Sequence, residues 1–138
     1  MRAGRLLIVI AIAALGVGLF SATAFAGKKK KTSVVYFGGN PKFNNSGKVT
    51  AKGTLNTASA CRVARGMRLQ VLDQTGAVLS TLDGSTSDSN GNWSVSGQLP
   101  STLPAGTNSV RVKALKLSVG KFVCKAGLST PVAVPAAK

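Results

Sequence analysis

Strict alternation of polar and apolar residues is the feature that most constrains what this chain can fold into. It is clearest in Lys48–Leu55, where one set of alternate side chains is polar and the other is small or apolar. Such a segment is typical of a β-strand with one face in water and one in the core. Short runs of this kind, separated by Gly, Pro, Asn and Ser, fill the chain after residue 26, and none of them has helical periodicity. The sequence therefore predicts an all-β domain, a two-sheet antiparallel sandwich of about seven or eight strands.

Two local signals refine this prediction. Asn90-Gly91 favours a two-residue type I′ hairpin turn, because both central residues of that turn need positive φ. Along Ser109–Leu117 the apolar positions change parity after Ala114. One extra residue in the strand would produce this change, so we expect a β-bulge at Lys113–Leu115.

The stretch Ser87–Val95 also has an alternative interpretation as a calcium loop, because Asp88 and the two asparagines after it alternate around a glycine. An EF-hand loop needs glycine at its sixth position and an acid at its twelfth. Counted from Asp88, these positions hold Trp93 and Leu99, so the motif fails. We predict no metal site, and a weak cation site near Asp83 and Asp88 stays open as the alternative.

The first 26 residues have the plan of a secretory signal peptide. The basic start MRAGR precedes an apolar run of 15 residues, Leu6–Phe20, and small residues lead to Ala26. We expect a helical signal cleaved after Ala26 and a protein that is secreted or held in the cell envelope. An uncleaved anchor is the alternative, since the 21 residues Leu6–Ala26 carry no charge and could cross a bilayer.

The expected organisation has four segments. They are a signal peptide at 1–26, a basic N-terminal tail with an edge strand at 27–45, the sandwich domain at 46–135 and a disordered tail at 136–138.

Charge and composition argue for binding and against catalysis. The chain has 18 Lys and Arg, three Asp, no Glu and no His, and loss of Arg2 and Arg5 with the signal would leave a net charge of +13. Such a field attracts anionic partners, although it also keeps a secreted domain soluble. General acid-base catalysis uses His or paired carboxylates, and the three Asp lie in or beside predicted turns. We therefore predict no catalytic residue, no cofactor and no enzyme.

Cys61 and Cys124 are the only cysteines. In an exported chain a single pair predicts one disulfide bond. Catalytic or metal-binding cysteine is the other interpretation, but the chain has no His and no second C-x-x-C half to complete such a site. A bridge would bring the sequence neighbourhoods of the two cysteines together.

Basic residues near these cysteines form the candidate site, a surface for an anionic polymer. Arginine offers a planar fork for phosphate or carboxylate, and lysine adds point charge. A solvated polar face is the alternative interpretation. Nucleic acid is not expected, because stacking aromatic residues are scarce. The candidate residues are Arg62, Arg65, Arg68, Arg111, Lys113, Lys121 and Lys125.

Several segments together are familiar from a known family. They are Gly47–Val49, Cys61 with Arg65, Met67-Leu69-Val71 on alternate positions, Gly76, Ser87–Trp93, Val110–Lys113, Val123-Cys124 and Ser129–Val132. Over Ser46–Val134 the chain resembles the carboxypeptidase-regulatory-like, or transthyretin-like, domains of secreted bacterial proteins, including those of actinobacteria. The resemblance implies an immunoglobulin-like sandwich and an envelope setting. It transfers no catalytic residue, because these domains are mostly accessory modules.

Two classes of function follow. The first is a secreted or envelope module with a structural or protein-interaction role. The second is a binding protein that takes an anionic polysaccharide or lipid head group through its basic residues. The partner is then an envelope protein or an anionic polymer, a membrane is reached only through an uncleaved signal or surface charge, and we expect a monomer.

Overall fold

The computed structural model describes residues 28–136, so the predicted signal peptide and the last two residues of the predicted tail lie outside it. Over this range the protein is all-β with antiparallel sheets and no α-helix. None of the described elements is a helix that could cross a bilayer. The elements are β1 Lys29–Lys31, β2 Val34–Phe37, β3 Lys42–Phe43, β4 Lys48–Asn56, the 3₁₀ turn η1 Ser59–Cys61, β5 Gly66–Leu72, β6 Val78–Thr86, β7 Asn92–Gln98, β8 Ser109–Ala114, β9 Leu117–Val119, β10 Phe122–Cys124, β11 Gly127–Leu128 and β12 Val132–Ala133.

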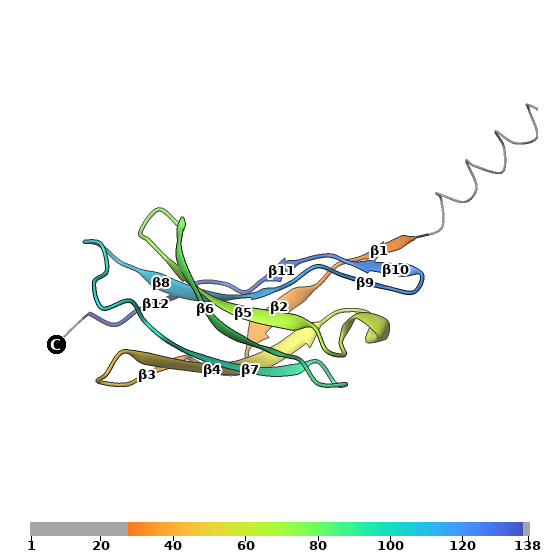
Figure 1. Cartoon of the computed structure of the whole chain (residues 1–138), viewed down its shortest axis with the longest axis horizontal. Coiled ribbons are helices and arrows are strands. Elements are labelled where there is room, and N and C mark those ends of the chain that lie inside the picture. The colour runs from red at the N-terminus through yellow and green to blue at the C-terminus, as the bar shows by residue number, and fades with distance from the viewer. Residues whose placement is uncertain (1–27, 137–138) are drawn as a thin grey trace, which may run out of the picture.

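Two antiparallel sheets lie in separate layers (Figure 1). In the four-stranded sheet, β4 is central, with β2 and β3 along one edge and β7 along the other. In the five-stranded sheet, β5 lies between β6 and β8, and β11 and β12 pair in turn with the far edge of β8. Chain connections pass between the layers, as they do from β4 to β5 and from β6 to β7.

One hydrophobic core fills the space between these two sheets. The alternation in the sequence decides which side chains enter it, since successive side chains of a strand point to opposite faces. The four-stranded sheet contributes Val35, Val49, Ala51, Leu55, Trp93 and Val95, and the five-stranded sheet contributes Met67, Leu69, Val71, Val110, Val112 and Ala114. Met67, Leu69 and Val71 are fully buried, and Trp93 is a core residue with 3% of its area exposed.

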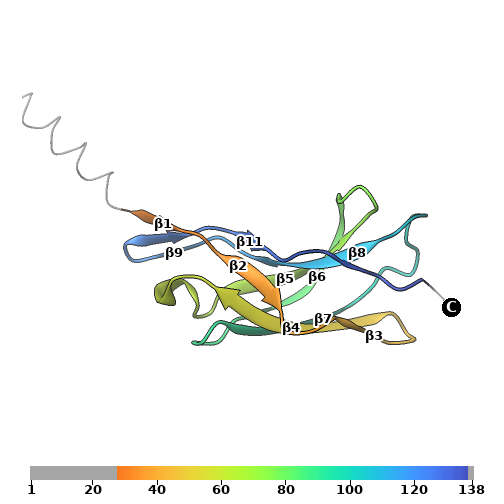
Figure 2. The same cartoon turned by 180° about the vertical axis from the view of Figure 1, so that it is seen from behind.

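A third, smaller sheet extends from one end of the molecule. Its order is β1-β10-β9, with β9 and β10 antiparallel and β1 parallel to β10. Figures 1 and 2 place it at the end of the molecule away from β3 and β12. The segment 27–45, which was expected to be a tail with one edge strand, therefore contains three paired strands, β1, β2 and β3.

The parity change after Ala114 has a different cause from the one predicted. The pairing of β8 with β5 is regular from Ser109 to Ala114, so the predicted β-bulge at Lys113–Leu115 is wrong. The chain instead leaves the five-stranded sheet after Ala114 and enters the small sheet as β9. A new sheet has a new inner face, and this resets the apolar parity. Register irregularities lie instead in the pairing of β5 with β6.

The turn at Asn90-Gly91 is also not the predicted two-residue hairpin. Strands β6 and β7 belong to different sheets, and Gly91 has positive φ (83°) whereas Asn90 does not. The turn runs from Asp88 to Asn92: Gly91 N donates to Asp88 O at 3.1 Å, and Asp88 N donates to Asn92 O at 2.9 Å. This is a type I turn followed by a left-handed glycine.

The same turn occurs three times in the described chain. Each copy begins with Asn or Asp, whose Oδ1 accepts the N–H groups two and four residues later, and has glycine at the fourth position with φ of 83° to 87°. The side-chain oxygen satisfies backbone donors that the turn leaves unpaired. The copies are Asn44–Lys48, Asp73–Ala77 and Asp88–Asn92.

These turns predict a narrow acid dependence of stability. Hydrogen bonds, first from the Thr75 hydroxyl, lower the pKa of Asp73, and the Asn92 N–H lowers that of Asp88. A carboxyl with a lowered folded-state pKa stabilises the fold above its unfolded value of about 4. It loses this contribution as the pH falls from about 4 through the folded pKa. We expect the urea midpoint to be level from about pH 7 to 5 and to fall below about pH 4.

The matched variant D73N/D88N places at both turns the residue type that the first turn already uses at Asn44. Its midpoint at pH 7 should stay close to that of the wild type, and its decline below about pH 4 should be much shallower. D83N serves as the control, since Asp83 is not the first residue of such a turn. A D73N/D88N chain with the full acid loss would contradict the assignment of that loss to these two carboxylates.

Candidate functional site

Lysines crowd the small three-stranded sheet, which we call the basic ribbon. Backbone hydrogen bonds hold the N-terminal lysine strand against β10: Lys29 N donates to Lys121 O and Lys125 N donates to Lys31 O, each at 2.9 Å. Lys31 is half-buried, with Nζ 5.2 Å from the centre of the Phe122 ring, a cation–π contact. The other lysines of the ribbon are exposed. The lysines on or beside its strands are Lys28, Lys29, Lys30, Lys31, Lys116, Lys121 and Lys125.

No strand of the basic ribbon carries a carboxylate. Asp73 and Asp88 begin turns next to β6, and Asp83 lies within β6 itself. Seven lysines on one small sheet repel each other, and an anion bound there would relieve that repulsion. This concentration of one sign of charge makes the ribbon the candidate binding surface of the described residues.

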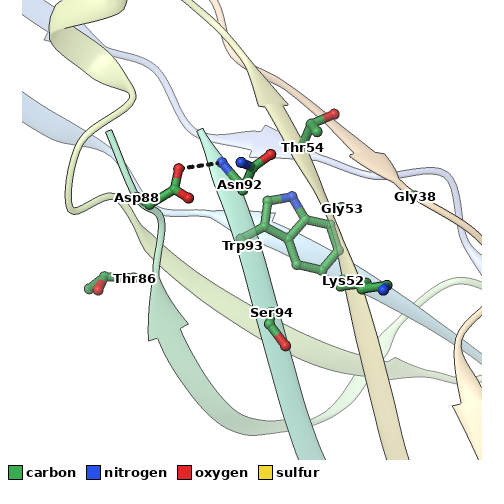
Figure 3. Close-up of a pocket in the computed structure, with 9 residues that line it drawn as sticks. All are labelled: Gly38, Lys52, Gly53, Thr54, Thr86, Asp88, Asn92, Trp93 and Ser94. Carbon is green, nitrogen blue, oxygen red and sulfur yellow. Dashed lines mark hydrogen bonds between the residues drawn. The ribbon is translucent and has the colours of Figure 1, made fainter. Parts of the chain in front are cut away.

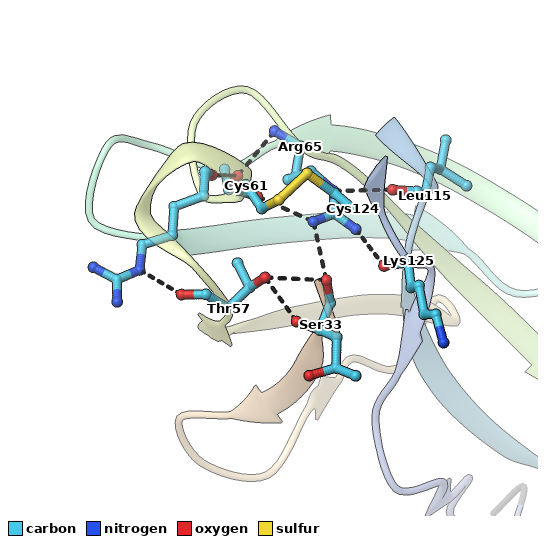
Figure 4. The surroundings of a disulfide bond; sticks show 10 residues. Ser33, Thr57, Cys61, Arg65, Leu115, Cys124 and Lys125 are labelled. Atoms are coloured by element: carbon cyan, nitrogen blue, oxygen red, sulfur yellow. Dashed lines mark hydrogen bonds between the residues drawn. A yellow bond between two sulfur atoms is a disulfide. The ribbon is translucent and has the colours of Figure 1, made fainter. Parts of the chain in front are cut away.

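The predicted disulfide between Cys61 and Cys124 is confirmed. Both cysteines are fully buried, and their Cα atoms lie 5.7 Å apart. Cys61 ends η1 and Cys124 ends β10, so the bond ties the basic ribbon to the loop between β4 and β5. Figure 4 shows the bond and the side chains around it.

Arg65 differs most from its predicted role. It was expected on an exposed binding surface, but its side chain is completely buried, with 0% of its area exposed. The physical reason is local: Ala64 has positive φ (54°), and Arg65 is fixed by reciprocal bonds with Ser87, since Arg65 N donates to Ser87 Oγ and Ser87 N donates to Arg65 O, both at 3.0 Å. Arg65 is thus no part of a surface that meets a partner.

The Arg65 guanidinium holds together the base of the basic ribbon (Figure 4). Nε donates to Leu115 O at 2.9 Å, just before β9, and Nη2 donates to Lys125 O at 2.8 Å, just after β10. Nη1 donates to Ser33 Oγ at 3.1 Å, beyond β1, and to Cys61 O at 3.0 Å in η1. One side chain therefore joins the segments next to all three strands of the ribbon and the disulfide loop. We call Arg65 with these four hydrogen bonds the Arg65 clamp.

The partners of Arg65 in these bonds are neutral oxygens, without a carboxylate among them. Burial lowers the pKa of Arg65 from its usual value, but arginine keeps its proton in proteins. The clamp is thus a buried cation held by three carbonyls and a hydroxyl. Its desolvation cost is offset only while all four oxygens stay in place.

The other predicted basic residues lie apart from the ribbon. Arg68 and Lys113 are paired across β5 and β8, and Arg111 Nε donates to Gln70 Oε1 at 2.9 Å on the same face. These three residues are half-buried on the five-stranded sheet. Arg62 is also half-buried, and its Nε donates to Thr57 O at 3.2 Å. Of the seven predicted residues, only Lys121 and Lys125 lie on the ribbon.

A shallow pocket of about 500 Å³ lies beside β4, β7 and the β6–β7 turn. Figure 3 shows Trp93 between the polar side chains of its wall. The indole Nε1 is buried without a hydrogen-bond partner among the described residues, but only 3% of Trp93 is exposed. The ring occupies the space of a missing side chain, because a Cβ on Gly53 would come within 2.6 Å of it. The indole therefore fills the core and offers no stacking face to a ligand.

No group of three or more His, Cys, Asp or Glu side chains among residues 28–136 could hold a metal ion. Asp88 Oδ1 accepts turn N–H groups instead. Asn90 and Gly91 are also part of this turn, in which Asn90 N donates to Asp88 Oδ1 and Gly91 N donates to Asp88 O.

The sequence interpretation missed the pairing of the N-terminal lysines. They were expected in a tail, yet Lys29–Lys31 form a strand. Their parallel partner strand, β10, lies 93 positions further along the chain. A run of four lysines has no local pattern that predicts such a pairing. Comparison of the chain with protein-family models, with curated proteins and with solved structures finds no match.

Proposed function

We propose that the protein is an exported, non-catalytic module of the cell envelope that acts by binding, and that the basic ribbon is its surface for an anionic envelope ligand, a polysaccharide or a lipid head group. The observation that carries this proposal is the ordered gathering of seven lysines on a sheet without a carboxylate. The disulfide and the Arg65 clamp support it, because they hold that sheet in one geometry. A preorganised charged surface binds with less loss of conformational entropy than a mobile tail.

Export is part of the proposal. The signal-peptide plan of residues 1–26 supports it. A disulfide between two buried cysteines is in keeping with an oxidising compartment. The scarcity of acidic residues and the absence of histidine from the sequence support a non-catalytic role.

An immunoglobulin-like, transthyretin-like sandwich is the proposed fold type. Two antiparallel sheets with a shared core support it, as does the Cys61–Cys124 bond. The basic ribbon is an addition to that plan, since its strands pair with neither of the two large sheets. We assign the binding function to the basic ribbon, and we assign to the sandwich the role of holding the ribbon in place.

The test is co-sedimentation of the exported chain with purified cell envelope across a salt series. We expect binding at about 0.05 M salt and its loss by about 0.5 M, because lysines that bind a polyanion release its counterions. K121E/K125E should abolish binding. The matched control K48E/K52E makes the same charge change on exposed positions of β4 and should bind nearly as wild type.

Equal loss in both variants would show that net charge, and not the ribbon, drives binding. Binding that survives high salt and both variants would instead indicate an envelope protein as the partner, which is the structural or protein-interaction role.

A further inference from the structure

We propose that the basic ribbon docks on the surface of an anionic lipid bilayer. This inference rests on the proposed function and names its partner, lipid phosphate head groups in a membrane. A soluble polyanion is the competing source of the same phosphate or carboxylate chemistry. The two ligands differ in the side chains that they can bind. A soluble polyanion binds only cationic side chains, whereas a bilayer surface also accepts apolar side chains.

Apolar side chains lie between the lysines of the ribbon. Leu117, Val119 and Phe122 share one face of the ribbon, since Phe122 pairs with Val119 and Leu117 with Cys124. All three are half-buried, and none of them belongs to the core between the two large sheets or packs against it. Val119 and Phe122 are paired at the turn that ends the β9–β10 hairpin, with exposed Lys121 between them in the chain. Lysine next to partly exposed apolar residues is the composition that binds at the boundary of head groups and acyl chains.

The chain continues from the ribbon into its most apolar segment. Leu6–Ala26 carries no charge, and Gly27 alone separates it from Lys28. An uncleaved signal, the alternative to cleavage after Ala26, would place the first lysines of the ribbon next to the membrane that holds it, where basic residues attract anionic head groups.

The basic ribbon also has the geometry for a flat partner. Its three strands project past the layered sheets at one end of the molecule (Figures 1 and 2), and β1 brings its lysines beside those at the β10 ends through parallel pairing. The carboxylates of Asp73, Asp83 and Asp88 lie on or next to β6 in the five-stranded sheet. When the ribbon is docked, these acidic residues would thus not lie between it and the anionic surface.

The experiment measures partition of the exported chain onto vesicles of phosphatidylcholine alone and of phosphatidylcholine with a quarter phosphatidylglycerol. We expect preference for the anionic vesicles. Because each surface lysine is worth about fivefold in partition, K121E/K125E should lower that preference by about 25-fold or more. K48E/K52E should change it by less than about threefold.

A second pair of variants tests the apolar contribution. V119S removes a half-buried apolar side chain from the ribbon and should weaken binding to anionic vesicles by about threefold. V78S removes a side chain that is 46% exposed on β6 and should have no effect. Neither variant removes a core side chain, so both should keep the wild-type fold, which circular dichroism would verify.

Soluble polyphosphate separates failure of this inference from failure of the proposed function. Ribbon-dependent polyphosphate binding without a preference for anionic vesicles would overturn membrane docking and leave the proposed function standing. Vesicle binding that V119S does not change would overturn it too, since the apolar side chains would then take no part. Loss of both kinds of binding, with envelope binding absent as well, would remove the proposed function itself.

Discussion

The R65M variant is expected to lose about 3 kcal/mol of unfolding free energy. The change deletes every donor of the Arg65 clamp, and it leaves the oxygens of Leu115, Lys125 and Cys61 without their guanidinium partner. An unpaired buried acceptor costs about 1–3 kcal/mol. The variant no longer buries a cation without a carboxylate partner, and this offsets part of that cost. Chemical denaturation gives the stability, and hydrogen exchange should show the largest loss of protection in β9 and β10.

R65K is the informative companion. Lysine keeps the charge but lacks the planar fork, so it can reach fewer of the oxygens around it. We expect a loss of about 2 kcal/mol, nearly as large as that of R65M. R111M, which removes a half-buried arginine with one side-chain bond to Gln70, should cost under about 1 kcal/mol. An R65M variant as stable as the wild type would show that the hydrogen bonds of the clamp do not contribute to the free energy of unfolding.

Removal of the disulfide should have the other large effect. The cysteines are separated by 63 positions, so C61A/C124A is expected to lose about 4 kcal/mol by the chain-entropy model. That is a large part of the ~5–15 kcal/mol available to a domain of this size. The denaturation midpoint, measured with and without reductant, is the readout.

Reduced wild-type protein should behave like C61A/C124A, whereas C61A/C124A itself should not respond to reductant. The disulfide and Arg65 hold the same junction, because Arg65 Nη1 bonds to Cys61 O. The triple variant R65M/C61A/C124A should therefore lose less than the sum of the separate losses. Additive losses would show that the bond and the clamp stabilise different parts of the protein.

The large strands were predictable because their signal is local. In β4, β5 and β7 alternate side chains enter one core, and a period of two residues is visible in any sequence. The disulfide was predictable because only two cysteines are present. Both follow from short-range patterns or from composition.

The site was less predictable because its geometry depends on distant pairings. Periodicity marks neither the parallel contact of β1 with β10 nor the change of sheet after Ala114. Arg65 is the clearest case: a charged residue amid other arginines predicts a surface, and only the positive φ of Ala64 and the oxygens of four separate segments make an interior position favourable. The three turns show the same limit on a smaller scale, because Asn or Asp followed by glycine at the fourth position indicates a turn but not which strands it joins.

The division of the chain between core and ribbon sets an order of assembly. The buried core residues all fall between Val35 and Ala114, whereas the ribbon combines residues 29–31 with residues 117–124. Contacts between such distant segments form late, since the loop between them must close first. A chain that stopped before β9 would keep every residue of the cluster between the two large sheets, but it would lack the ribbon, β11 and β12. The lysine surface is thus expected only on the fully folded protein, after both ends of the domain have been synthesised and have paired.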